Sequence, residues 1–130
     1  MISATFNWMK SLLTSWFHTE SGTLQSMRDV RALLIPGADP NLQDEPIPIR
    51  GDELVIGRHT DCQFRPDDPF LSLQHCRIHI EEGGCFIEDM GSTNGTFVNF
   101  EPVTNRQQLF EGDILEVGMM SFYLTLVNAA

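Results

Sequence analysis

Four side chains of this sequence have the chemistry to hold an anion, and they lie in three separate turns. Arg58 supplies a guanidinium, Ser72 a hydroxyl, and Thr93 with Asn94 a hydroxyl and an amide. A guanidinium can grip a phosphate or a carboxylate through two parallel hydrogen bonds. Short apolar runs typical of strands separate the turns. Three such turns in order predict loops gathered at one end of a β-sandwich, around a site for an anionic ligand.

Each of these residues also has a plain structural interpretation, which the sequence leaves open. Arg58 stands at the end of a strand-like run and can be a solvated charge, and Ser72 can be a turn hydroxyl. Asn94-Gly95 taken alone is an ordinary turn signal. His75 has no nucleophile or carboxylate at a spacing that supports catalysis. We therefore interpret His75 as a histidine that braces a loop through hydrogen bonds to the backbone.

The elements that must position these turns are predicted to form an all-β, antiparallel sandwich. From Val30 onward, short apolar runs are separated by turn signals every ~8–12 residues, and no parallel βαβ pattern occurs. Gly83-Gly84 is expected to make a hairpin. The expected strands are Arg31–Ile35, Ile47–Arg50, Glu53–Ile56, Cys62–Arg65, Cys76–Glu81, Cys85–Glu88, Thr96–Asn99, Ile114–Val117 and Phe122–Val127.

The three cysteines, Cys62, Cys76 and Cys85, are expected to be free thiols. Their number is odd and they lack the CxxC spacing, so neither a zinc site nor a disulfide framework is indicated. A hairpin that pairs Ile80 with Phe86 would leave Cys76 and Cys85 beyond the ~7 Å Cα separation that a disulfide tolerates. Free thiols indicate a reducing compartment, and no basic region precedes an apolar run as in a signal peptide. We expect a cytoplasmic location.

Residues 1–25 are predicted to form an amphipathic helix and a linker, ahead of one domain over residues 26–130. Apolar residues recur at steps of three and four behind Ser3, a suitable N-cap, which favours a helix over roughly Ser3–Phe17. His18–Ser26 is polar and contains glycine, as linkers do. The helix carries one basic residue, so we expect it to pack on the sandwich or on a second copy and not on a membrane.

The charge balance excludes several classes of function. With 8 Lys+Arg against 18 Asp+Glu, the formal net charge is -10, which argues against nucleic acid and anionic membrane surfaces as partners. No stretch approaches the ~20 apolar residues of a membrane-spanning helix. The histidines do not have the spacing of a metal-ligand set, so neither a metal nor a cofactor is expected. Without an acid–base or metal constellation, an enzyme is not indicated.

Taken together, the motifs resemble those of the forkhead-associated (FHA) domain family. The resemblance covers roughly Val30 to Val127 and implies an eleven-stranded β-sandwich that binds phosphothreonine peptides through loops at one end and catalyses nothing. The matching stretches are Val55-Ile-Gly-Arg58, Asp61-Cys-Gln-Phe64, Asp67-Asp-Pro-Phe-Leu-Ser-Leu-Gln-His75, Phe86-Ile-Glu-Asp-Met-Gly-Ser-Thr-Asn-Gly-Thr-Phe-Val-Asn99 and Leu109-Phe-Glu-Gly-Asp-Ile-Leu-Glu-Val-Gly118.

The resemblance also implies a role for each residue of the turns. Arg58 and Ser72 match the family's phosphate contacts. Thr93 matches a further contact to the phosphothreonine, and Asn94 matches the residue that hydrogen-bonds the peptide backbone. Three more positions match residues that shape the loops: Gly57, His75 and Gly95.

The sequence departs from the family pattern at two positions. The residue after the serine is usually polar or basic and often touches phosphate, but here it is Leu73. A hydrogen bond to a charged group contributes ~1.5–3 kcal/mol, so its absence would weaken binding ~10- to 100-fold. The usual glycine after Val-Asn is replaced by Phe100, which changes the expected geometry of the next turn.

The sequence thus predicts a signalling or adaptor module that binds a threonine-phosphorylated protein or peptide. A Ser/Thr kinase and a second copy, through the N-terminal helix, are further candidate partners. The alternative is a phospho-independent structural module that builds a larger complex through its sandwich faces or that helix. The retained set Arg58, Ser72, Thr93 and Asn94 favours phosphothreonine binding, because a purely structural descendant need not keep it.

Overall fold

The computed structural model describes residues 30–37 and 45–127 of the chain. The predicted helix over Ser3–Phe17, its linker and the domain boundary near residue 26 lie outside the described residues. The described part consists of ten strands: β1 (Val30–Pro36), β2 (Ile47–Arg50), β3 (Glu53–Ile56), β4 (Cys76–Glu81), β5 (Gly84–Asp89), β6 (Thr96–Val98), β7 (Glu101–Pro102), β8 (Arg106–Leu109), β9 (Ile114–Val117) and β10 (Met120–Leu126).

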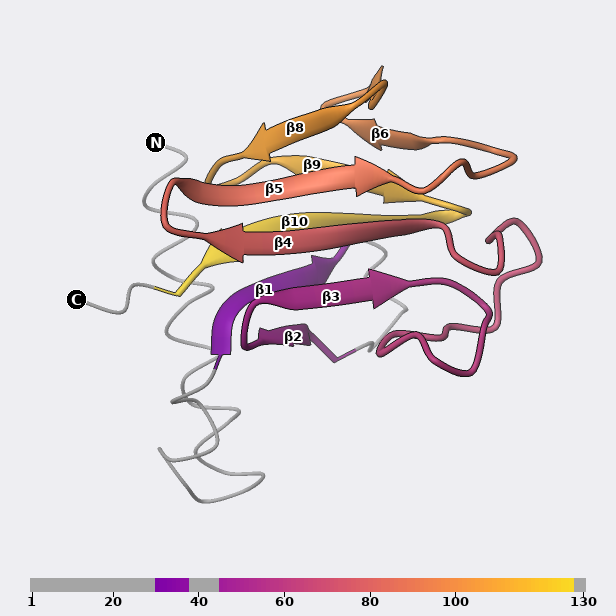
Figure 1. Cartoon of the computed structure of the whole chain (residues 1–130), viewed down its shortest axis with the longest axis horizontal. Helices are drawn as coiled ribbons and strands as arrows, with labels where there is room; N and C mark the ends of the chain where they lie inside the picture. Colours follow the sequence, from indigo (N-terminus) through magenta and orange to yellow (C-terminus); the bar gives the residue numbers. More distant parts are fainter. Residues whose placement is uncertain (1–29, 38–44, 128–130) are drawn as a thin grey trace.

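The strands form two sheets that face each other (Figure 1). One sheet has the order β2-β1-β10-β9-β6-β7 and the other β3-β4-β5-β8, and all their strand pairs are antiparallel. The prediction of an all-β antiparallel fold is therefore confirmed. The described residues contain no helix, and hence none that is long and apolar enough to cross a membrane.

Every second side chain along the strands points inward, and these side chains fill the space between the sheets. On β4, Cys76 and Ile78 are fully buried, whereas Arg77 and His79 point to the outer face and are only half-buried. Each fully buried aliphatic side chain contributes ~1.5–3 kcal/mol relative to an exposed one. The same core takes in residues from both sheets, among them Leu34, Ile49, Ile56, Ile87, Leu115 and Leu124. This rigid core fixes the strand ends from which the loops emerge.

The β4–β5 hairpin differs by one residue from the predicted register. Ile80 pairs with Cys85, and Phe86 pairs with His79, so the prediction that Ile80 faces Phe86 was wrong. Directly opposed residues lie on the same face of a sheet, and a one-residue slip would move the buried set to the solvent side. Ile80 and Cys85 are both buried, whereas Phe86 lies on the outer face.

The prediction of free thiols is confirmed for all three cysteines, which are buried. Cys76 pairs with Asp89, four rungs along the ladder from Cys85, which places the two Cα atoms roughly 13 Å apart along the strands. Burial raises the pKa of the Cys76 thiol to about 12 and that of Cys85 to about 11. Both thiols are therefore protonated and unreactive at neutral pH.

Two expectations about strands were wrong. Cys62–Arg65 is not a strand, because only Phe64 forms a bridge, with Ile56. The side chain of Gln63 accepts the Val55 amide at 2.7 Å, a position that a ladder carbonyl would otherwise fill.

Conversely, β7 and β8 were not predicted, since they lack a run of apolar residues. The described residues thus show ten strands and one bridge, where the resemblance implied eleven.

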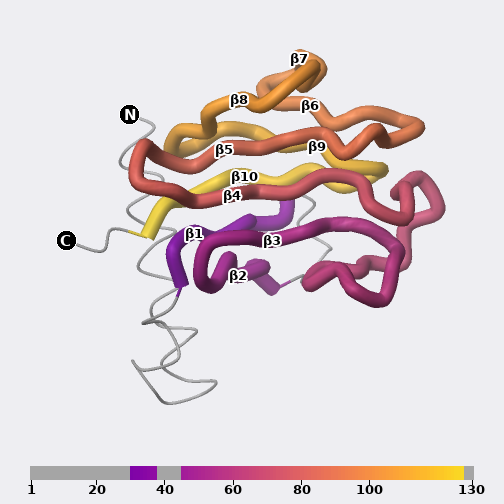
Figure 2. Tube along the Cα trace, in the orientation of Figure 1, coloured from indigo at the N-terminus to yellow at the C-terminus, as the bar shows by residue number. Residues whose placement is uncertain are grey.

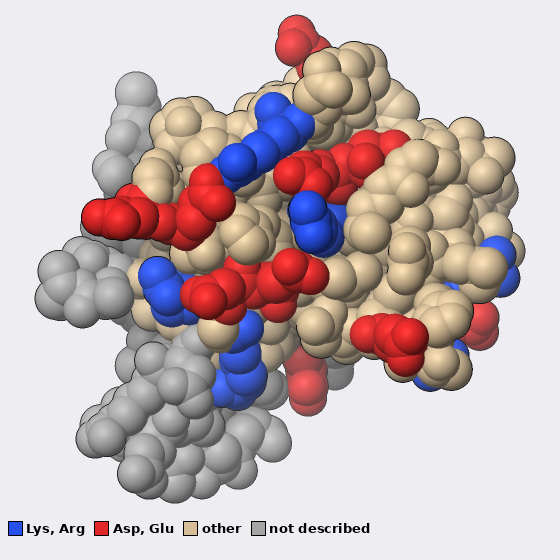
Figure 3. All heavy atoms as spheres, in the orientation of Figure 1, with Lys and Arg blue, Asp and Glu red and all other residues tan. Residues whose placement is uncertain are grey.

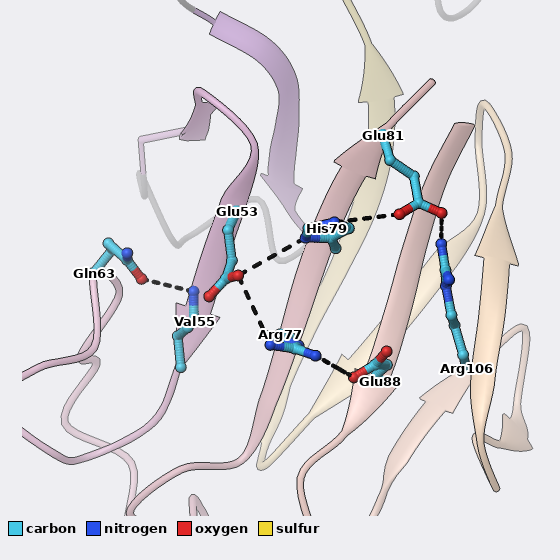
Figure 4. Close-up of polar contacts among 8 residues, drawn as sticks. All are labelled: Glu53, Val55, Gln63, Arg77, His79, Glu81, Glu88 and Arg106. Atoms are coloured by element: carbon cyan, nitrogen blue, oxygen red, sulfur yellow. Dashed lines mark hydrogen bonds and ion pairs between the residues drawn. The ribbon is translucent and has the colours of Figure 1, made fainter. Parts of the chain in front are cut away.

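The outer face of the four-stranded sheet neutralises its own charges. Arg77 lies 2.8 Å from Glu88 and 3.8 Å from Glu53, and Arg106 is paired with Glu81 (Figure 4). Acidic and basic side chains alternate across this face in the space-filling view (Figure 3). Exposed ion pairs of this kind contribute only ~0–1 kcal/mol each. With its cations already paired, this face is a poor place for a phosphate.

The β6–β7 hairpin has a strained turn. Its two turn residues, Asn99 and Phe100, have φ values of 50° and 70°, the left-handed region. Turns of this type favour Asn-Gly, because a side chain on the second residue is strained by ~1–2 kcal/mol. We expect Phe100→Gly to stabilise the protein by ~1 kcal/mol, measured by urea denaturation.

A matched substitution controls for this effect. Phe110 is also exposed but has no positive φ, so Phe110→Gly gains no relief of strain and adds backbone freedom to the unfolded chain. It should leave stability unchanged or lower it by ~0.5–1 kcal/mol. Equal effects of the two substitutions would show that the turn at Phe100 is not strained.

Candidate anion-binding site

Two loops far apart in the sequence meet at one end of the sandwich. Residues 57–75 connect β3 to β4, and residues 90–95 connect β5 to β6. Both loops lie on the right in Figures 1 and 2. Hydrogen bonds within and between them bring Arg58, Ser72, Thr93 and Asn94 into one region.

Arg58 is held at the start of this region by the backbone of the second half of its own loop. Its amide donates to the Ser72 carbonyl at 3.1 Å, and its Nε donates to the Leu71 carbonyl at 2.6 Å. The preceding residue must be glycine, since a Cβ on Gly57 would lie 2.2 Å from the Leu73 carbonyl oxygen. Gly57 therefore permits the close approach that places an exposed guanidinium beside Ser72.

Ser72 joins the two loops. Its hydroxyl oxygen accepts the Thr93 amide at 3.0 Å, across 21 positions of sequence. Its own amide donates to Nδ1 of His75 at 3.1 Å. The hydroxyl hydrogen of Ser72 stays available to donate to an anion, because the contact with Thr93 uses only a lone pair of the oxygen.

His75 braces both loops from beneath. It is fully buried, and its Nε2 lies 2.7 Å from the Gly95 carbonyl. Because Nδ1 accepts the Ser72 amide, Nε2 must carry the hydrogen and donate it to Gly95, which defines a neutral imidazole. The contacts leave His75 no access to a ligand, so its role at the site is to position other residues.

Thr93 and Asn94 complete the rim of the region. Both are exposed, and the Asn94 amide nitrogen donates to the Phe70 carbonyl at 2.9 Å, a second contact between the loops. Gly95 follows with φ 87°, in the left-handed region that favours glycine. This turn directs Thr93 and Asn94 outward and the Gly95 carbonyl inward to His75.

Asp89 shapes the second loop and was missed by sequence reasoning. Its carboxylate accepts the hydroxyls of Ser92 and Thr96 at 2.5 and 2.7 Å, and the amides of Gly91 and Ser92 at 3.1 and 3.0 Å. Burial favours the neutral acid, but the hydrogen bonds from Ser92 and Thr96 outweigh it and lower the pKa of Asp89. The charged carboxylate is thus part of the loop's structure.

This lowered pKa predicts how stability depends on pH. Because the pKa is lower in the folded than in the unfolded chain, the contribution of Asp89 is complete above ~3.9 and is lost as pH falls through the folded value. We expect Asp89→Asn to be less stable than the parent at neutral pH. The difference between their free energies of unfolding should narrow below about pH 4. Urea denaturation across that range measures it. Ser92→Ala should also lower stability more at neutral than at acidic pH. A difference in free energy of unfolding that does not depend on pH would contradict the lowered pKa of Asp89.

Asp68 is a second carboxylate that sequence reasoning missed. It is buried, and its oxygens accept the amides of Phe70 and Met119, both at 2.8 Å. A Cβ on Gly118 would lie 2.5 Å from one of these oxygens. Asp68 therefore ties the Ser72 loop to the β9–β10 turn. The aspartate two residues before Phe70 is the usual pattern of a side-chain turn and was the available signal.

Arg65 adds a second guanidinium beside Arg58. Its Nε donates to the Arg58 carbonyl at 3.3 Å, and its side chain is exposed. Among the residues that the structure describes, no carboxylate lies within ion-pairing distance of Arg58 or Arg65. Two exposed cations that no described carboxylate pairs, at the end of the sandwich that carries Ser72, make this end of an otherwise acidic protein suited to an anion.

Leu73 occupies the exposed position next to these groups. Its side chain is 55% exposed, while its carbonyl accepts the His59 amide at 3.0 Å and the Cys62 thiol at 3.4 Å. The backbone of Leu73 is thus fixed, and its side chain is free of the core. A longer polar residue could be accommodated here without disturbing the loop.

A β-sandwich with its polar loops braced at one end is the architecture of a recognition module. Residues 54–118 match the model of the FHA domain, and the chain belongs to this family. It is 37% identical over 92 residues to the oxoglutarate dehydrogenase inhibitor of Corynebacterium efficiens, covering 67% of this chain and 60% of that protein. It is 36% identical over 92 residues to the glycogen accumulation regulator GarA of Mycolicibacterium smegmatis, covering 67% and 54%. The match therefore spans about three fifths of these relatives.

Solved structures of FHA domains have the same fold. One, from an analysis of phosphothreonine-dependent FHA interactions, has a TM-score of 0.66 at 28% identity and covers 75% of this chain and 98% of that one. Another is the FhaA FHA domain complexed with the intracellular domain of Rv3910, with a TM-score of 0.62 at 31% identity, covering 72% and 98%. FHA domains are phosphothreonine-binding modules, and the named relatives are an inhibitor and a regulator.

Proposed function

We propose that this chain is a phosphothreonine-dependent adaptor that binds a threonine-phosphorylated protein or peptide. The observation that supports it most directly is the hydrogen bond of 3.0 Å between the Ser72 hydroxyl and the Thr93 amide, with Arg58 bonded to the Ser72 carbonyl. Arg58 and Ser72 contact the phosphate, Thr93 contacts the phosphothreonine, and Asn94 bonds the peptide backbone. Gly57, His75 and Gly95 shape the loops.

Arg65 extends this assignment beyond the family motif. Its Nε lies 3.3 Å from the Arg58 carbonyl, so the guanidinium can reach the region next to Arg58. Arg65 thus supplies the second positive charge that a basic residue in place of Leu73 would provide. A phosphate group carries about −1.5 to −2 charges, which two guanidinium groups balance.

The partner is a regulated protein, by analogy with the relatives. The oxoglutarate dehydrogenase inhibitor and GarA are named for an inhibitory and a regulatory role, and the FhaA domain was solved with an intracellular domain. We assign a cytoplasmic location, a signalling role, and a Ser/Thr kinase as the source of the phosphate. The N-terminal segment is a candidate contact to a second copy.

A library of phosphothreonine peptides, measured against its unphosphorylated counterpart, tests the proposal. We expect the phosphothreonine peptides to bind and their unphosphorylated counterparts not to bind. Peptides with phosphoserine in place of phosphothreonine should bind more weakly than the phosphothreonine peptides. Equal binding of phosphorylated and unphosphorylated peptides, or none of either, would favour the phospho-independent structural module.

Leu73→Arg should strengthen phosphopeptide binding. The side chain at this position is exposed beside Arg58 and Ser72, so a guanidinium there adds one charge-assisted contact to the phosphate. We expect affinity to rise ~10-fold or more in a calorimetric titration.

A matched substitution separates this contact from a general gain of positive charge. Met119→Arg adds the same charge at an exposed residue of the β9–β10 turn. It should raise affinity by less than Leu73→Arg, since long-range attraction is screened by salt. Equal gains from the two changes would mean that Leu73 does not face the phosphate.

A further inference from the structure

Two exposed phenylalanines at the other end of the sandwich have no role in the fold or in the anion site. Phe100 is 70% exposed and Phe110 is 60% exposed. β6 and β8, which lead to them, both run away from the loops that carry the anion site (Figure 1). Leu109, which precedes Phe110, pairs with Cys85 at the start of β5, whereas Asp89 at its other end belongs to the site.

A hydrogen-bonded junction fixes these two phenylalanines on neighbouring pieces of backbone. Asn99, next to Phe100, donates from its side chain to Asp113 Oδ1 at 3.0 Å. The other oxygen of Asp113 accepts the Phe110 amide at 2.7 Å. Asn99 also exchanges two hydrogen bonds with Ile114, at 2.8 and 3.0 Å. The β6–β7 turn and the segment after β8 therefore form one rigid surface.

Phe100 occupies a position where its backbone is strained. Its φ of 70° favours glycine, so the backbone is strained. The ring is exposed, so burial of the side chain does not offset this strain. Strained residues that the core does not require tend to occur where the side chain serves a function. A large aromatic side chain held in solvent by a strained turn is suited to contact another molecule.

Each of the two phenylalanines is followed by an exposed glutamate. These are Glu101 and Glu111, and the carboxylate of Glu111 is held in place by Thr125 and Leu126, each at 2.8 Å. The Phe100–Phe110 patch, defined by these two Phe-Glu pairs, is thus apolar with a negative rim. Such a rim attracts basic groups and repels phosphate, so nucleic acid does not fit it.

A second copy does not fit the patch either. A symmetric contact through the same surface would place the glutamates of one copy against those of the other. The chain already carries a net charge of -10, which adds to the repulsion. The complementary surface is one that carries an apolar side chain between lysines or arginines.

We propose that the Phe100–Phe110 patch is a second protein-docking surface, which binds a partner segment with an apolar side chain flanked by basic residues. Because it lies at the other end of the sandwich, it can be occupied while the anion site holds its ligand. The chain would then bridge two proteins, or two segments of one protein.

The test uses a short, unphosphorylated peptide with two tryptophans flanked by lysines, titrated into the isotopically labelled full chain. Amide shifts should concentrate at residues 99–101 and 109–114. Phe100→Gly and Phe110→Ser should each weaken binding at least ~10-fold, as expected for truncated aromatic anchors. Neither substitution changes the net charge, so non-specific attraction of the cationic peptide stays constant.

Three controls separate docking from other causes. Phe100→Gly should not lower the melting temperature, so its loss of binding cannot come from unfolding. Met119→Ser, which removes an apolar side chain that is 73% exposed at the other end, should leave affinity unchanged. Peptides with serine for tryptophan, or glutamate for lysine, should bind at least ~10-fold more weakly.

The proposal is overturned if the two phenylalanine variants bind as the parent does, or if Met119→Ser loses affinity equally. It is also overturned if sedimentation finds a dimer that Phe100→Gly dissociates, since the patch would then join two copies. None of these measurements involves phosphate, so they are independent of the proposed function.

Discussion

Arg58→Ala should abolish phosphopeptide binding and leave the fold nearly intact. The guanidinium is exposed and has no carboxylate partner among the described residues, so its charge is free for a ligand. Loss of a charged contact to a phosphate costs ~2–5 kcal/mol of binding, or at least ~30-fold in affinity. Loss of the bond from Nε to the Leu71 carbonyl costs ~0.5–1.5 kcal/mol of stability.

Calorimetric titration and thermal melting measure the two halves of this prediction. Arg31→Ala is the matched control, because Arg31 is exposed on β1 and pairs only loosely, at 3.7 Å, with Asp52. It should change neither affinity nor stability appreciably. An Arg58→Ala protein that binds phosphopeptide normally would contradict the proposed function.

His75→Ala should destabilise the protein more than truncation of any exposed side chain at the site, such as Arg58, Thr93 or Asn94. It removes the acceptor of the Ser72 amide and the donor to the Gly95 carbonyl, and it leaves a cavity beneath both loops. Buried polar groups without partners cost ~1–3 kcal/mol each, so we expect a loss of ~3–5 kcal/mol. Phosphopeptide affinity should fall as well, since Ser72 and Thr93 lose their common support.

The matched control for this change is His79→Ala on the outer face of β4. His79 lies 3.3 Å from Glu81 and 3.8 Å from Glu53, and its side chain is partly exposed (Figure 4). Its removal should cost no more than ~1 kcal/mol. Urea denaturation of both variants decides the matter, and a His75→Ala protein as stable as His79→Ala would rule out the bracing role.

The sequence was sufficient to predict features whose geometry is set by residues close together in the chain. Gly57-Arg58 and Ser92-Thr-Asn-Gly95 could be recognised because turn chemistry is local, and alternation on Cys76–Glu81 predicted which side chains are buried. The all-β class followed from the spacing of such runs. These features depend on neighbours within a few positions.

Some of the missed features depend on contacts between residues that are not neighbours in the sequence, whereas Asp89 bonds residues only two to seven positions away. Asp68 bonds Met119 across 51 positions, and Arg65 reaches the Arg58 carbonyl from the far side of a loop. The pairing of Ile80 with Cys85 could have been found by matching buried faces across the hairpin, which the predicted register did not do. β8 could not be predicted from Arg106-Gln-Gln-Leu109, since its pairing with β5 decides its conformation.

The contact between Ser72 and Thr93 has a consequence for the kinetics of recognition. Both loops are already joined through this bond and through His75, so a ligand meets an assembled site and does not have to order it. Association then costs little conformational entropy, and peptides that differ in their flanking residues should associate at similar rates. Selectivity among phosphorylated partners is therefore expected to reside in how long each complex lasts.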